Sequence, residues 1–426
     1  MGIAILVGGL LVFLFIGMPI GFSMGISSFI YILYQGRYPL TLIPQRFASG
    51  MESFPLLAVP FFILAGQMMN QTGVTTRIFS FANALVGHIK GGLAHVNILA
   101  SVIFAGMSGT ANADVAGLGT IEINAMVEQG YDPAFSAAVT AASSVIGPII
   151  PPSVMLVIYA VITEVSVGRL FLGGIIPGLL IAAALMLMVY FFQSDHDVPI
   201  QPRASLAEVG RALRDAALPL LAPVFILGGI FAGVVTPTEA GAVAIAYATV
   251  LGFIYREMNL RVLWEVLVDS VKSTAVVMFI IFSASVFGWL VVRENIPQYV
   301  SSVILSYTTN PVIVLLLINV FLLILGTLME SVAILVIVAP VLAHMAKAVG
   351  IDLVHLGLVV VYNILIGFIT PPVGIGLFVV SDIAEVPVAK VIKATLPFLV
   401  PLLVVLLIIT YVPATVTWLP NLVYGS

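Results

Sequence analysis

The sequence has no cysteine, and charged residues make up only 8% of its 426 positions. Without cysteine the chain can form no disulfide, carries no thiol chemistry and has no Cys-ligated metal site. Soluble domains have about 25% charged residues, so a chain this poor in charge is not an ordinary soluble protein. The formal net charge is −4 and no basic tract is present, so nucleic acid is not an expected partner.

Enzyme motifs are also missing. The chain has no G-x-x-x-x-G-K-[ST] phosphate loop, so it should not hydrolyse ATP itself. Its five histidines form neither an H-E-x-x-H motif nor a clustered metal set, and no G-x-S-x-G elbow is present. We therefore expect no enzyme and no catalytic residues.

Apolar residues dominate the chain. Hydrophobic residues make up 61% of it and the mean hydropathy is +1.22. Apolar stretches of about 20 residues recur from end to end, which predicts an all-α polytopic membrane protein in a lipid bilayer. The N-terminus is apolar to about Leu33 and has no basic n-region, so we expect a retained membrane helix and not a signal peptide.

One helix-breaking motif occurs twice. Gly147-Pro148-Ile149-Ile150-Pro151-Pro152-Ser153 returns as Gly367-Phe368-Ile369-Thr370-Pro371-Pro372-Val373. Prolines lack the N–H group and clash with the preceding turn, so each copy should break a helix at membrane depth. Such breaks are tolerated only where protein or a water-filled cavity satisfies the freed backbone groups. Two breaks at matching positions of two halves are typical of the binding site of a secondary transporter.

Other glycines, prolines and aspartates repeat at the same offset of 220 residues. The further pairs are Gly106 with Gly326, Gly130 with Gly350, Asp132 with Asp352, and Pro177 with Pro397. Such an ungapped series predicts an internal duplication. The charges of the joints between apolar segments do not decide whether the repeats are parallel or inverted.

Polar residues inside the long apolar run 92–127 predict a hairpin. As one helix this run would be roughly 54 Å long, well over a hydrocarbon core of about 30 Å. It fits better as a helical hairpin with residues 108–112 at its tip, followed by a broken helix at 133–163. The counterparts are a second hairpin, 312–346, with its tip near Gly326 to Ser331, and a broken helix at 353–382.

Broken helices expose carbonyls at one end and N–H groups at the other. Carbonyl, Ser, Thr and Asn oxygens suit Na⁺, while N–H ends suit a carboxylate. We expect two or more Na⁺ sites, with ligands drawn from Ser108, Ser143, Ser144, Gly147, Ile150, Pro151, Gly326, Glu330, Asn363, Gly367, Thr370 and Pro371. The expected substrate contacts are Ser108, Thr110, Asn112, Asp114, Ser153, Met329, Ser331 and Val373.

The alternative is that small and hydroxyl residues only let helices pack closely. Asp114 and Glu330 are acids at membrane depth, where burial is expensive, so cation coupling, proton coupling and a structural hydrogen bond all remain open for them. Thr236-Pro237-Thr238-Glu239 has a plainer interpretation, a capping box that opens a helix over 237–255.

These motifs together resemble a known family. Ser108 to Asp114, Gly130 to Pro133, Thr140 to Ser153, Thr236 to Val243 and Gly367 to Gly374 resemble the large membrane subunit, DctM type, of tripartite ATP-independent periplasmic (TRAP) transporters. The resemblance covers nearly the whole chain. Asn112, Glu122 and Asn124 are more polar than the family pattern, and Glu330 stands where a shorter Asp is common.

The resemblance implies partners and a mechanism. A small four-helix membrane subunit (DctQ type) and a periplasmic substrate-binding protein (DctP type) would work with the chain in the bacterial inner membrane. Uptake of an organic acid, such as sialic acid or another sugar acid, a C4-dicarboxylate or a 2-oxo acid, would be driven by Na⁺ in an elevator movement. The implied fold has two inverted repeats with re-entrant hairpins, as in the ion-transporter superfamily.

The resemblance also implies a division of the chain. We expect scaffold or arm helices at 1–91, the first half of a transport domain at 92–192 and an amphipathic connector at 193–215. Scaffold helices of the second half follow at 216–297, and the second half of the transport domain at 298–426. The nearest alternative function is a self-sufficient Na⁺-coupled anion symporter of the divalent-anion kind. A channel would show a continuous polar stripe on several helices, and an intramembrane enzyme would need a catalytic cluster, which Asp114 and Glu330 alone do not make. A purely structural scaffold would have no reason to break two helices symmetrically.

Overall fold

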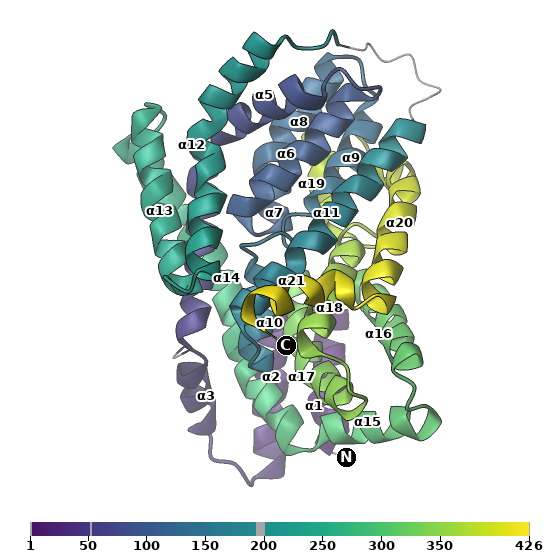
Figure 1. Cartoon of the computed structure of the whole chain (residues 1–426). Coiled ribbons are helices and arrows are strands. Elements are labelled where there is room, and N and C mark those ends of the chain that lie inside the picture. Colours follow the sequence, from purple (N-terminus) through teal and green to yellow (C-terminus); the bar gives the residue numbers. More distant parts are fainter. Residues whose placement is uncertain (1, 52, 193–200, 426) are drawn as a thin grey trace.

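The computed structural model describes residues 2–51, 53–192 and 201–425, and every regular element in these ranges is a helix (Figure 1). The first half contains α1 (Gly2–Phe15), α2 (Ile20–Gln35), α3 (Leu42–Met51), η1 (Phe54–Leu57), α4 (Ala58–Gln71), α5 (Val74–Val86), α6 (Gly92–Ser108), α7 (Ala111–Ala113), η2 (Asp114–Leu118), α8 (Gly119–Glu128), α9 (Pro133–Ser144), α10 (Val154–Thr163) and α11 (Val167–Phe192). The second half contains α12 (Leu206–Phe231), α13 (Pro237–Ile254), α14 (Leu260–Arg293), α15 (Ile296–Tyr307), α16 (Pro311–Gly326), α17 (Ser331–Ala348), α18 (Leu353–Phe368), α19 (Ile375–Ile383), α20 (Val388–Tyr411) and α21 (Ala414–Tyr424).

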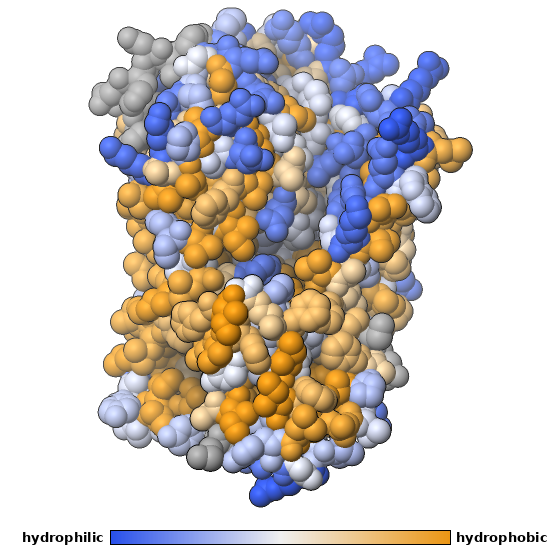
Figure 2. All heavy atoms as spheres, turned by 180° about the vertical axis from the view of Figure 1, so that it is seen from behind, coloured by the Kyte–Doolittle hydropathy of each residue, from blue (hydrophilic) through white to orange (hydrophobic). Residues whose placement is uncertain are grey.

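Helix length and surface polarity show a multi-span membrane protein. Seven helices in the described ranges are long and apolar enough to cross a membrane: Phe54–Gln71, Val167–Phe191, Leu206–Phe231, Pro237–Ile254, Leu260–Arg293, Ser331–Ala348 and Val388–Tyr411. Figure 2 shows hydrophilic residues gathered at the upper end and again along the lower edge, with mainly apolar residues between them. This band is the surface expected to face lipid.

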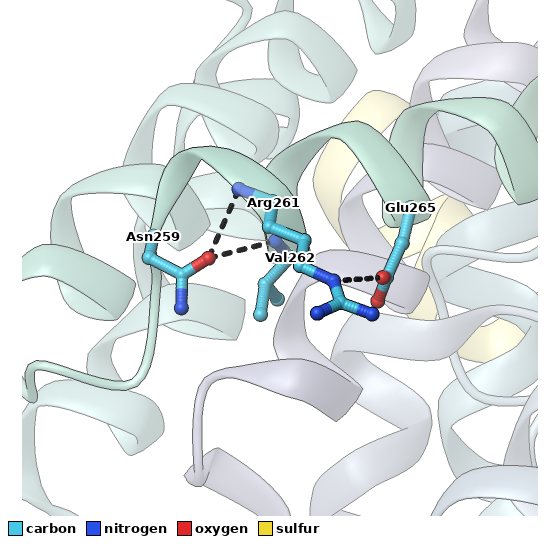
Figure 3. A network of polar contacts seen from close by, with 4 residues as sticks. All are labelled: Asn259, Arg261, Val262 and Glu265. Atoms are coloured by element: carbon cyan, nitrogen blue, oxygen red, sulfur yellow. Dashed lines mark hydrogen bonds and ion pairs between the residues drawn. The ribbon is translucent and has the colours of Figure 1, made fainter.

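The longest helix, α14, begins outside the apolar band. The Asn259 carboxamide oxygen accepts hydrogen bonds from the N–H groups of Arg261 and Val262, both at 2.9 Å, and so caps the helix (Figure 3). Arg261 and Glu265 then pair at 2.9 Å, with side chains 88% and 57% exposed. A pair this exposed contributes little stability, but its charges mark a turn that lies in water and not in lipid.

The predicted amphipathic connector is not a separate helix in the described residues. Residues 193–200 lie outside the described part of the chain. Leu206, Val209 and Leu213 form the first turns of α12, which runs unbroken past residue 215 to Phe231. Ser205 and Glu208 open α12 with a capping box, a local signal that fixes where the helix begins. The capping box predicted at Thr236 and Glu239 is confirmed and opens α13.

Two of the residue pairs at the 220-residue offset have the same roles in both halves. Asp132 accepts a hydrogen bond from Phe135 N at 2.8 Å and caps α9, and Asp352 accepts one from His355 N at 2.9 Å and caps α18. Gly130 and Gly350, just before these caps, have φ angles of 88° and 75°, which a side chain would strain. The sequence repeat is therefore also a repeat of local structure.

Helices are interrupted where the sequence predicts breaks. A first helical hairpin consists of α6, then the short segments α7 and η2, then α8; the second consists of α16 and α17. The first broken helix is α9 and α10, and the second is α18 and α19. In Figure 1, α6 and α8 lie in the upper half of the molecule and α16 and α17 in the lower half. The two hairpins thus approach the middle of the bundle from opposite ends.

Candidate functional site

A cavity of about 550 Å³ lies where the two hairpins and the two helix breaks meet. Two further helices, α4 and α14, complete its wall. The lining residues include, from the hairpins and breaks, Ser108, Thr110, Asn112, Pro148, Glu330, Ser331 and Phe368, and, from α4 and α14, Gln67, Asn70 and Ser273. The volume is in the range of pockets that enclose small organic ligands.

The first hairpin tip is held by its own hydroxyl groups. After α6 the backbone turns at Gly109, whose φ of 65° favours glycine, and Thr110 then caps α7 by accepting a hydrogen bond from Ala113 N at 3.2 Å. The Ser108 hydroxyl donates to Oδ1 of Asp114, which is 2% exposed. Oδ2 of Asp114 has no hydrogen-bond partner among the described residues, so the tip carries a buried carboxylate oxygen without a hydrogen bond.

The first helix break lies against this carboxylate. A Cβ atom added at Gly147 would overlap Oδ2 and the carboxyl carbon of Asp114, so only glycine fits there. Ser153 caps α10 by accepting from Leu156 N at 3.2 Å, and its hydroxyl donates to the Pro148 carbonyl. Val154 N donates to the Gly109 carbonyl at 3.2 Å, which joins the break to the tip.

The second tip and break meet in the same way. Val373 N donates to the Thr327 carbonyl at 3.3 Å, as Val154 does to Gly109. Glu330 caps α17 by accepting from Ala333 N at 2.9 Å, and it also lines the cavity. The Thr370 hydroxyl donates to the Ile366 carbonyl at 2.6 Å and so tightens the end of α18.

Buried side-chain hydrogen bonds tie each hairpin to its broken helix. In the first half, Asn97 on α6 accepts from the Ser143 hydroxyl and donates to the Thr140 hydroxyl, both at 2.7 Å. In the second half, the Asn363 amide donates to Oδ1 of Asn319 on α16 at 2.9 Å. Ser143 and Asn363 are a pair at the 220-residue offset, whereas Asn97 and Asn319 are 222 residues apart, so the two bridges are similar in place but not matched residue by residue. We call them the Asn97–Ser143 bridge and the Asn319–Asn363 bridge.

The residues predicted from the sequence fall into three groups. Ser108, Thr110, Asn112, Glu330 and Ser331 line the cavity. Asp114, Ser143, Ser144, Gly147, Pro151, Ser153, Gly326, Asn363 and Gly367 are buried behind this surface, where they form the tips, breaks and bridges, and Ile150, Thr370 and Pro371 lie partly buried in the breaks. Met329 and Val373 do not line the cavity, although Val373 N holds the second tip.

Polar residues of α4 and α14 also reach the cavity and were not predicted from the sequence. Gln67, Asn70 and Ser273 line the cavity from outside the hairpins and breaks. Polar residues in apolar helices were the available signal, but the sequence does not show which helix face is turned toward the site. Of the two other unusually polar residues named from the sequence, Glu122 is buried on α8 and Asn124 is exposed.

The cavity lining has an unusual charge balance. Among the described residues that line it, none is Lys or Arg, and Glu330 is the one charged side chain. An anionic solute therefore meets no side-chain cation there, and its charge has to be balanced by helix N-termini or by bound cations.

Paired helix breaks around a central polar cavity, within a bundle of apolar helices, define a multi-span membrane transporter. The chain belongs to the family described as "Tripartite ATP-independent periplasmic transporter, DctM component", whose model matches residues 7–415. It is thus the large permease subunit of a TRAP transporter, and it is not an enzyme. Membership of a tripartite, ATP-independent system implies the two other components of such a system.

Three relatives illustrate the similarity. The sialic acid TRAP transporter large permease protein SiaM of Vibrio cholerae is 46% identical over 98% of both chains. The C4-dicarboxylate TRAP transporter large permease protein DctM of Pseudomonas aeruginosa is 43% identical over 94% of both. The sialic acid TRAP transporter permease protein SiaT of Haemophilus influenzae is 40% identical over 97% of this chain and 67% of its own length.

A solved structure supports the fold. The YdaH transporter of Alcanivorax borkumensis superimposes with a TM-score of 0.66 over 89% of both chains, at 16% sequence identity. At that identity the likeness concerns the fold alone.

Proposed function

We propose that this subunit carries an organic acid into the cell together with Na⁺, after a periplasmic binding protein has delivered the acid. The observation that carries the proposal is a cavity formed by two hairpin tips and two helix breaks with no Lys or Arg among its described lining residues. The relatives named for sialic acid and C4-dicarboxylate transport support an anionic solute. Bound Na⁺ supplies the positive charge that the side chains do not.

The first Na⁺ site lies at the first tip and break. Ser108 and Asp114 provide oxygens there, and Oδ2 of Asp114 faces the backbone at Gly147 without a hydrogen-bond partner. The carbonyl groups released by the break at Gly147 to Pro151 complete an oxygen-rich environment, which suits a hard cation. Ser143 and Ser144, at the end of α9, help to shape it.

The second Na⁺ site lies at the second tip and break. Oδ1 of Asn363 is buried and has no partner among the described residues, while its amide nitrogen is fixed by Asn319. The backbone of Gly326 and Gly367 and the carbonyls toward Thr370 and Pro371 provide further oxygens. Glu330 stays at the cavity surface as the cap of α17. Occupied Na⁺ sites order the tips so that their N–H groups accept the solute's carboxylate.

The movement we propose is an elevator movement of a transport domain. Its two halves, 92–192 and 298–426, contain the hairpins and broken helices as inverted, re-entrant repeats. The opposite placement of the hairpins in Figure 1 and the equivalent caps at Asp132 and Asp352 support this arrangement. Helices within 1–91 and 216–297 form the scaffold and arms, and α4 and α14 present the fixed wall of the cavity.

The location we propose is the bacterial inner membrane, beside a DctQ-type small subunit. Junctions at the upper end of Figure 1 carry more Lys and Arg than those at the lower end. By sequence, Arg203, Arg211 and Arg214 lie before or in the first turns of α12 and Lys390 and Lys393 in the first turns of α20, whereas Arg37 lies between α2 and α3 and Arg293 ends α14. The positive-inside bias therefore favours a cytoplasmic upper end and a periplasmic N-terminus.

Reconstituted uptake tests the proposal. The permease and the small subunit are reconstituted into proteoliposomes, and the binding protein is added to the outside solution. Uptake of radiolabelled organic acids is then measured with an inward Na⁺ gradient or with K⁺ in its place. Uptake should need all three proteins and Na⁺. Uptake by this chain alone would favour a self-sufficient symporter, and uptake that is equal in K⁺ would contradict Na⁺ coupling.

A further inference from the structure

We infer that Gln67, Asn70 and Ser273 form a polar subsite that binds the hydroxyl and amide groups of the solute's tail, and that the cavity selects a polyhydroxylated monocarboxylate over a dicarboxylate. The inference rests on the proposed function, in which the tips hold the carboxylate. It adds specificity-determining residues on α4 and α14, outside the hairpins and breaks.

Gln67 is held in one orientation by two serines of α14. The Ser270 hydroxyl donates to Oε1 of Gln67 at 2.5 Å, and Nε2 of Gln67 donates to the Ser273 hydroxyl at 3.1 Å. Ser270 is 4% exposed and does not line the cavity, whereas Gln67 and Ser273 do. Ser270 is therefore a positioning residue. In this arrangement the second Nε2 hydrogen of Gln67 and the hydroxyl hydrogen of Ser273 are left for other partners.

Asn70 extends the subsite by one helical turn. Its Nδ2 donates to the Ala113 carbonyl of the first tip at 3.5 Å, and Oδ1 is buried with no partner among the described residues. This oxygen is enclosed against Gly117 and is not open to the cavity, so Asn70 contributes to the subsite as a cavity-lining side chain that is tied to the first tip. Asn70 also packs against Gly117, where a Cβ atom would overlap its amide, so the side chain has little freedom to turn away.

The charges of the cavity disfavour a second carboxylate. Amide and hydroxyl groups on α4 and α14 offer donors and acceptors, but no cation among the described lining residues. Glu330 adds a carboxyl group, and no cation, to the same cavity. A hydroxylated tail forms neutral hydrogen bonds with this surface, whereas a second carboxylate is desolvated there with no Lys or Arg among the described lining residues to balance it. The volume of about 550 Å³ is also more than a four-carbon diacid fills.

Ligand binding by the purified complex with its small subunit tests the inference. Thermal shifts are measured in Na⁺ and in K⁺ with N-acetylneuraminate, succinate or pyruvate, which are a polyhydroxylated monocarboxylate, a dicarboxylate and a short monocarboxylate. The wild type should bind N-acetylneuraminate more tightly than succinate. Gln67→Leu should weaken N-acetylneuraminate binding about tenfold while pyruvate changes by less than about twofold, since pyruvate has no tail to lose contact.

One control variant on α4 and two test variants on α14 accompany Gln67→Leu. Gln71→Leu, at the exposed end of α4 and outside the cavity, should leave all affinities unchanged. Ser270→Ala should weaken N-acetylneuraminate binding without affecting pyruvate, and Ser270→Thr should restore it. Equal loss for both acids in Gln67→Leu, or no loss for either, overturns the subsite. Tighter succinate binding overturns the substrate class while Na⁺ coupling stands, and no Na⁺-dependent binding of any acid overturns the proposed function as well.

Discussion

The backbones of Gly326 and Gly367 are in direct contact. A Cβ atom on Gly326 would lie 2.9 Å from Cα of Gly367, and one on Gly367 would overlap the backbone of Gly326. Gly326 ends α16 and Gly367 lies at the end of α18, so the second hairpin and the second broken helix touch at the points where both stop being regular.

Gly367→Ala should abolish Na⁺-dependent uptake and destabilise the protein by about 1–3 kcal/mol, because the added methyl group forces the two backbones apart. Uptake and the melting temperature of the purified complex measure the two effects. Gly288→Ala on α14 is the matched control, since a Cβ atom there meets nothing within 4 Å. Normal uptake by Gly367→Ala would show that the close contact is not required.

Ser108→Ala and Asp114→Asn should each raise the Na⁺ concentration for half-maximal uptake by about tenfold or more. Each variant removes a hydrogen bond or charge at the first tip, and bonds to charged groups contribute about 1.5–3 kcal/mol. The measurement is uptake against Na⁺ concentration at saturating solute. Thr120→Ala, an exposed hydroxyl on the same hairpin, should behave as the wild type. An unchanged Na⁺ dependence in both variants would place the first site elsewhere.

Asn319→Leu should destabilise the protein by about 1 kcal/mol and also weaken Na⁺ binding. The substitution removes the side-chain bonds of Asn319 to Asn363 and to the Thr410 hydroxyl, the latter at 2.9 Å, within apolar surroundings. Melting curves taken with increasing Na⁺ separate the two effects. Asn124→Leu, at an exposed position, is the control. If stability falls while the Na⁺-dependent shift is unchanged, the Asn319–Asn363 bridge is structural only.

Single cysteines near residue 90 and near residue 37 should be labelled from opposite sides of the membrane. The positive-inside bias predicts that a membrane-impermeant thiol reagent applied to whole spheroplasts reaches residue 37 and not residue 90. Because the chain has no cysteine, each variant carries one thiol and no cysteine-free background is needed. Labelling of residue 90 in intact spheroplasts would reverse the orientation.

Much of the fold could be predicted because short local sequence motifs determine its helix breaks, turns and caps. The Gly-to-Pro-Pro segments 147–152 and 367–372 interrupt helices, whereas the single prolines Pro177 and Pro397 lie inside α11 and α20. The glycines and aspartates at 130, 132, 350 and 352 specify turn and cap geometry within a few residues. The residues at the first tip, Ser108 to Asn112, could be predicted for the same reason. They lie within an apolar run that is too long for one membrane crossing, so a turn is expected there.

The rest depends on packing between distant segments. Gln67 and Ser273 meet across about 200 residues of sequence, and nothing near either residue indicates the pairing. The π-helical turn Asp114–Leu118, which follows the first tip, was not predicted either. No local sequence pattern distinguishes such a turn from an α-helix. The end of the connector was misplaced at residue 215 because helix α12 changes from polar to apolar without changing its conformation.

A cavity without cationic side chains has an electrical consequence. If two Na⁺ ions cross with one monocarboxylate, each turnover moves one net positive charge inward, because Na⁺ stays in the cell with the solute whereas a charged side chain would return with the protein. Each charge gains about 2.3 kcal/mol per 100 mV of membrane potential, inside negative. That is a roughly fiftyfold accumulation of solute per 100 mV, so the voltage alone could load the cell even when Na⁺ is equal on both sides.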